Sequence, residues 1–84
     1  MKAYYITFRS VTYAQRGEKL LNQKGIRCSI LRTPRWMEAQ GCGYALKVWT
    51  KDVYPAVELL RESNVSVRRI YLQMEGGQLE EITV

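Results

Sequence analysis

Stretches in which apolar and polar residues alternate, or in which aromatic and β-branched residues gather, predict five β-strands. The predicted strands cover residues 3–8, 26–32, 44–49, 65–74 and 79–84. Between the last two, the pair Gly76-Gly77 predicts a tight hairpin turn. The chain is therefore expected to form a sheet that ends in a hairpin.

Two other segments show apolar residues at the i, i+3, i+4 spacing of an amphipathic helix. The first helix is expected over residues 11–24, with Ser10 as its N-cap and Gly25 ending it. Gly17 lies on the apolar face of this helix, which predicts close packing against the sheet. The second helix is expected over residues 52–63.

The order of elements is strand, helix, strand, strand, helix, strand, and then one more strand. This order predicts a single α+β domain over residues 1–84, a ferredoxin-like split βαβ sandwich (βαββαβ) with an extra C-terminal strand. In that topology the third strand runs opposite to the first two. One edge of the sheet is then expected to hold Arg9, Ser10, residues 32–35, Cys42 and Gly43.

Length and composition narrow the functional classes. A chain of 84 residues has no room for a large internal cavity, so a site is expected on a surface or an edge. The sequence has no histidine, which excludes Ser-His-Asp and Cys-His hydrolases and Cys2His2 zinc sites within this chain. It also has no Cys-x-x-Cys pair, and neither a metal nor a cofactor is expected.

The net charge of +5 is unevenly distributed. Residues 1–35 carry eight basic residues against Glu18 alone, a net charge of +7, which leaves −2 for the remainder. A basic half suits an anionic ligand or an acidic partner, although a solvated basic face is about as common. The chain shows neither a membrane-spanning run nor a signal-peptide pattern, so we expect a cytoplasmic protein with free thiols.

Cys42 stands between Gly41 and Gly43, and glycines on both sides leave a cysteine sulfur accessible. The N-terminus of the first helix and the side chains of Arg9, Arg32 or Arg35 would favour its thiolate form at the expected edge. This pattern fits a nucleophilic or carrier thiol, and it fits equally well a small residue in a glycine-rich turn. Cys28, on the inner side of its strand, is expected to serve packing.

Four segments in the right order resemble one known family. They are Tyr5-Ile6-Thr7-Phe8-Arg9-Ser10, then Glu18-Lys19-Leu20-Leu21 with Gly25-Ile26, then Thr33-Pro34-Arg35, and finally Cys42-Gly43-Tyr44-Ala45-Leu46. Together they cover most of residues 4–48, and on them the chain resembles the small bacterial selenium/sulfur carrier protein-like family. It departs from the family pattern at Arg9, where a histidine is usual, and over residues 36–41, where a serine-rich stretch is usual.

The resemblance implies that Cys42 is the signature cysteine of the family and that Thr33, Pro34 and Arg35 belong to the same site. We therefore expect a carrier or accessory protein rather than an independent enzyme. It would accept a persulfide or perselenide and pass it on. Its partner would be a cysteine desulfurase or a selenium-pathway enzyme, acting as donor or acceptor. The expected binding residues are Arg9, Ser10, Thr33, Pro34, Arg35, Gly41 and Gly43.

Two other readings share the expected topology. An RNA-recognition module would need Tyr44 and Leu46 to face outward, but the phase set by Lys47 turns Ala45 and Trp49 to solvent instead. Nucleic-acid binding is therefore not expected beyond a weak, salt-dependent attraction.

The second reading is a small regulatory or interaction protein that pairs its open sheet face in a homodimer. The residues that carry this reading are the aromatic side chains Tyr5, Trp49 and Tyr71 among Arg27, Lys47 and Arg69.

Overall fold

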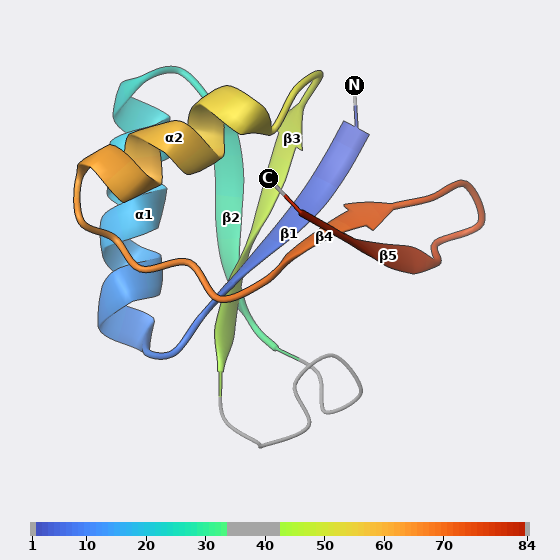
Figure 1. The fold of residues 1–84 in the computed structure, drawn as a ribbon, viewed down its shortest axis with the longest axis horizontal. Helices are drawn as coiled ribbons and strands as arrows, with labels where there is room; N and C mark the ends of the chain where they lie inside the picture. The colour runs from blue at the N-terminus through green and yellow to red at the C-terminus, as the bar shows by residue number, and fades with distance from the viewer. Residues whose placement is uncertain (1, 34–42, 84) are drawn as a thin grey trace.

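The computed structural model describes residues 2–33 and 43–83. It is an α+β fold with a five-stranded antiparallel sheet and two helices that cover one face of the sheet (Figure 1). The elements are β1 (Lys2–Phe8), α1 (Val11–Gln23), β2 (Arg27–Arg32), β3 (Tyr44–Thr50), α2 (Tyr54–Glu62), β4 (Ile70–Gln73) and β5 (Leu79–Ile82). The strand order is β2-β3-β1-β4-β5.

The hydrophobic core lies between the two helices and the sheet. Ile6 and Phe8 of β1, together with Leu46 and Val48 of β3, point at the helices and are fully buried. The helices contribute their own apolar faces, which include Ala14, Leu21, Ala56, Val57 and Leu60.

Among the described residues, no helix is long and apolar enough to cross a bilayer.

The boundaries of α1 confirm the sequence signals. The Oγ of Ser10 accepts a hydrogen bond from the backbone N–H of Tyr13 over 3.4 Å, as an N-cap does. After the helix, Gly25 has a φ of +77°, a left-handed conformation that glycine adopts without steric cost. Ser10 thus fixes the direction in which the chain leaves β1.

Gly17 is buried because the sheet and α2 approach α1 closely at this point. A Cβ atom on residue 17 would lie 3.1 Å from Leu46 Cδ1, 3.2 Å from Leu60 Cδ2 and 3.3 Å from Phe8 Cζ. The expectation of close packing is confirmed.

We expect Gly17→Val to lower the free energy of unfolding by about 2 kcal/mol, since a branched side chain here must push three core side chains apart. Urea denaturation measures the change. Gln15→Val, at an exposed position of the same helix, should cost no more than about 0.7 kcal/mol through helix propensity alone. Equal losses at the two positions would contradict the packing argument.

The fourth strand was predicted too long, because it begins at Ile70 and not at residue 65. Before it, the backbone N–H of Arg68 donates to the carbonyl of Thr7, while the carbonyl of Arg69 accepts the N–H of Thr7. Arg68 and Arg69 therefore both lie opposite Thr7, which is the arrangement of a β-bulge. The Oγ1 of Thr7 accepts the remaining N–H of Arg69 over 3.0 Å, so the bulge leaves none of these groups unpaired.

The phase predicted for β3 is correct for its core side, but two expectations about the open face are wrong. Ala45 is fully buried, because its small side chain lies between Thr7 and Leu31 on the neighbouring strands. Tyr71 is only 8% exposed, although it was expected to be part of an exposed aromatic patch. The alternation of apolar and polar residues along one strand does not show how far side chains on the neighbouring strands shield a residue from solvent.

Candidate functional site at one edge of the sheet

The sheet brings several predicted site residues to one of its edges. Phe8, Tyr44 and Arg32 lie opposite one another on β1, β3 and β2. One residue further, the N–H of Thr33 donates to the carbonyl of Gly43 over 3.0 Å. Arg9 and Ser10 directly follow Phe8, so residues from three strands meet here as the topology predicted.

Four of the expected site residues, Pro34, Arg35, Gly41 and Cys42, lie outside the described residues. The described part of the expected edge consists of Arg9, Ser10, Arg32, Thr33 and Gly43. Gly43 is covalently bonded to Cys42 and is itself buried.

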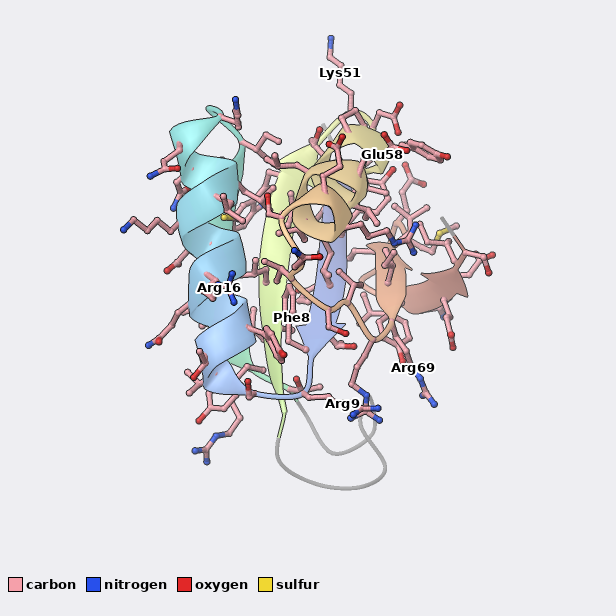
Figure 2. The ribbon with its side chains drawn as sticks, turned by 60° about the vertical axis from the view of Figure 1, so that its left-hand side comes forward. Phe8, Arg9, Arg16, Lys51, Glu58 and Arg69 are labelled. Atoms are coloured by element: carbon pink, nitrogen blue, oxygen red, sulfur yellow. The ribbon has the colours of Figure 1, made fainter. Side chains whose placement is uncertain are left out.

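Sequence reasoning did not assign Arg68 and Arg69 to this edge. They reach it because the bulge holds them against Thr7, two residues before Arg9. Figure 2 shows Arg9 and Arg69 at the same end of the sheet. The signal in the sequence was the pair Arg68-Arg69, but a regular strand through both residues would have sent them to opposite faces.

The positive end of α1 adds to the basic character of the edge. The first turn of α1 contains no acidic residue that would compensate the helix dipole. Arg9 is exposed immediately before it. The guanidinium of Arg32, in contrast, already contacts an aromatic ring of this chain, because its Cζ lies 5.9 Å from the centroid of the Tyr44 ring. The described edge is thus basic on the side chain of Arg9 and at the backbone N–H groups of the helix N-terminus.

Thr33 is the second unusual feature of the edge. It is 6% exposed, and its Oγ1 is a buried polar atom without a hydrogen-bond partner. In the described part of the chain it is the one buried side-chain oxygen or nitrogen of this kind. An unmade hydrogen bond at a buried hydroxyl costs about 1–3 kcal/mol, so Thr33 carries an unused hydrogen-bond donor directly beside Gly43.

Cys28 lies where the sequence predicted, in the packing between α1 and β2. It is partly buried, and its Sγ lies 3.7 Å from the carbonyl oxygen of Glu18 and 3.6 Å from Oδ1 of Asn22. Burial, followed by the negative charge of Glu18, raises the pKa of the Cys28 thiol to about 11. Cys28 is consequently a neutral thiol at physiological pH and a poor nucleophile.

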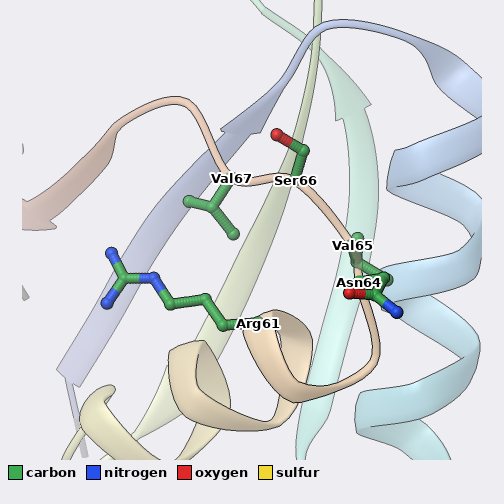
Figure 3. Close-up of a pocket in the computed structure, with 5 residues that line it drawn as sticks. All are labelled: Arg61, Asn64, Val65, Ser66 and Val67. Atoms are coloured by element: carbon green, nitrogen blue, oxygen red, sulfur yellow. The ribbon is translucent and has the colours of Figure 1, made fainter.

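The structure also has a surface hollow that none of Arg9, Ser10, Thr33 and Gly43 lines. The hollow in Figure 3 lies between the end of α2 and the segment that leads to the bulge. It is lined by Arg61, Asn64, Val65, Ser66 and Val67.

Within residues 2–33 and 43–83, no three cysteine, aspartate or glutamate side chains are grouped so that they could hold a metal ion.

Residues 3–72 match the protein family described as "Putative Se/S carrier protein-like". The chain belongs to this family. The match spans both helices, β2 and β3, and all but one residue of β1 and of β4, so it includes Cys42 and every described residue of the edge. No curated protein was found that matches the chain.

Proposed function

We propose that this protein carries sulfur or selenium on the thiolate of Cys42. The family match supports a carrier of these elements. The observation that supports the location is the hydrogen bond between Thr33 and Gly43, which fixes the neighbour of Cys42 at the basic edge beside Arg9 and the start of α1. A thiolate there would benefit from both positive groups.

The choice between the two cysteines follows from their surroundings. Cys28 has a pKa of about 11 and makes its contacts inside the packing of α1 on β2. Cys42 has glycine on both sides, which leaves room for the active-site loop of a partner enzyme. We therefore assign the carrier role to Cys42 and a packing role to Cys28.

The proposed transfer is an exchange without net oxidation. The Cys42 thiolate attacks the terminal sulfur or selenium of a persulfide or perselenide on the donor enzyme. A bond forms between Cys42 Sγ and that atom, the bond to the donor cysteine breaks, and the donor cysteine leaves as a thiolate. An acceptor thiolate then attacks the terminal atom and releases Cys42 as a thiolate.

The surrounding residues have separate roles in this proposal. Arg9 and Arg35 stabilise the anionic thiolate and its adduct by charge-assisted hydrogen bonds. Backbone N–H groups near Gly43 and Ser10 supply further donors, and the buried hydroxyl of Thr33 is a candidate donor to the adduct. The side-chain oxygen of Ser10 is already engaged as the N-cap of α1.

The test is to incubate the protein with a cysteine desulfurase and ³⁵S-cysteine in the absence of reductant. We expect the label on Cys42 in the wild type and in Cys28→Ser, and loss of the protein-bound label in Cys42→Ser. Thr33→Val, which keeps the shape of the side chain but removes the hydroxyl, should shorten the lifetime of the adduct. Label that persists in Cys42→Ser, or none in the wild type with any sulfur or selenium donor, would reject the proposal.

We also infer that the fold is the ferredoxin-like split βαβ sandwich. Without β5, the strand order is β4-β1-β3-β2 with antiparallel neighbours and both helices on one face. This agrees with the order that the βαββαβ topology requires. The strand β5 would then be an addition beside β4.

A further inference from the structure

The face of the sheet opposite the helices carries one row of residues across all five strands. Backbone pairing joins Ser29 to Lys47, Lys47 to Tyr5, Tyr5 to Tyr71, and Tyr71 to Glu81. The row is basic toward β2 and acidic at β5, with two tyrosines between. Outside the row, Arg68 and Arg69 line a hollow together with Glu81, so the gradient is a property of this row and not of the whole face. In the adjacent row, Arg27 lies opposite Trp49 and adds a second cation on the basic side.

Two aromatic rings of this face, those of Tyr5 and Trp49, are already in contact with cations of the same chain. Lys47 Nζ lies 5.6 Å from the centroid of the Tyr5 ring and 5.3 Å from that of Trp49. Arg27 Cζ lies 5.0 Å from the Trp49 centroid. A nucleic-acid base could stack on these rings only by displacing the cations, which disfavours a single-stranded nucleic acid as the occupant.

The charge gradient makes the face complementary to itself in one orientation. When two copies pack face to face about a two-fold axis parallel to β1, β2 of one copy lies over β5 of the other and β3 lies over β4. Lys47 and Arg27 then approach the partner's Glu81, and Tyr5 lies near the axis. An axis across the strands would instead bring Lys47 close to the partner's Lys47.

We propose that the open face of the sheet binds the open face of a second copy of this chain in the strand-parallel orientation. Tyr5 and Trp49, each half-buried, supply apolar area at the centre of the interface. Lys47 and Glu81 fix its orientation, because opposite charges across an interface select one arrangement over the alternatives. The basic edge at Arg9 and Gly43 lies at the end of the strands and stays accessible in this dimer.

A charge-exchange experiment tests this geometry by sedimentation equilibrium. Lys47→Glu and Glu81→Lys should each raise the dimer dissociation constant at least about tenfold, because each variant places two like-charge pairs in the interface. An equimolar mixture of the two variants should form a heterodimer, since every pair across the interface is again opposite in charge. The double variant Lys47→Glu/Glu81→Lys should recover the homodimer.

Matched controls are available on the helix-covered side. Lys19→Glu on α1 and Glu58→Lys on α2 make the same charge changes at exposed positions and should leave the dissociation constant unchanged. A monomeric wild type at about millimolar concentration would overturn the proposal. So would a dimer that is unaffected by both single variants, or variants that fail to recover association when mixed. Binding of single-stranded RNA by a monomeric wild type, lost in Trp49→Ala, would identify nucleic acid as the occupant instead.

Discussion

Iodoacetamide should alkylate Cys42 about thirtyfold faster than Cys28 in the folded protein at pH 7.5. The pKa of Cys28 is about 11, whereas an unperturbed cysteine has a pKa of about 8.5, so their thiolate populations differ by about 300-fold. The higher basicity of the Cys28 thiolate recovers about tenfold of this difference through greater nucleophilicity. A Cys42 pKa lowered by the basic edge would widen the separation.

The pH dependence separates the two thiols further. Burial raises the pKa of Cys28, so its alkylation rate should climb about tenfold per pH unit and level off only near pH 11. The rate at Cys42 should level off at or below about pH 8.5. Mass spectrometry of Cys28→Ser and Cys42→Ser, each with one remaining thiol, gives the two profiles separately.

Unfolding in urea provides the control, since Cys28 should then react like an ordinary thiol. If Cys28 reacted as quickly as Cys42 in the folded protein, the packing role assigned to it would be wrong. If Arg9→Ala left the Cys42 profile unchanged, the proposed stabilisation of its thiolate by Arg9 would be wrong as well.

Phe8→Ala should lower the free energy of unfolding by about 3–5 kcal/mol, the range measured for fully buried phenylalanines. Phe8 ends β1, contacts α1 where Gly17 allows close approach, and directly precedes Arg9 and Ser10. A domain of this size has only about 5–15 kcal/mol of stability in total, so the variant should be close to unfolding. Urea denaturation followed by far-UV circular dichroism measures the loss.

Tyr54→Ala is a suitable comparison, because Tyr54 is a large side chain on the first turn of α2 but is 54% exposed. It should change the free energy of unfolding by no more than about 0.5 kcal/mol. Similar losses for Phe8→Ala and Tyr54→Ala would contradict the core described between the helices and the sheet.

The sequence alone determined those features that depend on short-range physical chemistry. Ser10 and Gly25 ended α1 correctly because capping involves only residues close together in the chain. Alternation placed Leu46 and Val48 in the core because one face of a strand is buried as a unit. The order of elements placed Arg9, Thr33 and Gly43 at a common edge, since the topology leaves few ways to connect the strands.

The tertiary structure alone decided the features that depend on neighbouring strands. The bulge at Arg68 and Arg69 arises because Thr7, more than sixty residues earlier, pairs with both of them. The burial of Ala45 and Tyr71 and the high pKa of Cys28 depend on side chains from other elements. The charge gradient across the open face appears only when the register aligns Lys47, Tyr5, Tyr71 and Glu81. Such properties belong to pairs of residues far apart in the chain, and a local pattern carries no record of which segments become neighbours.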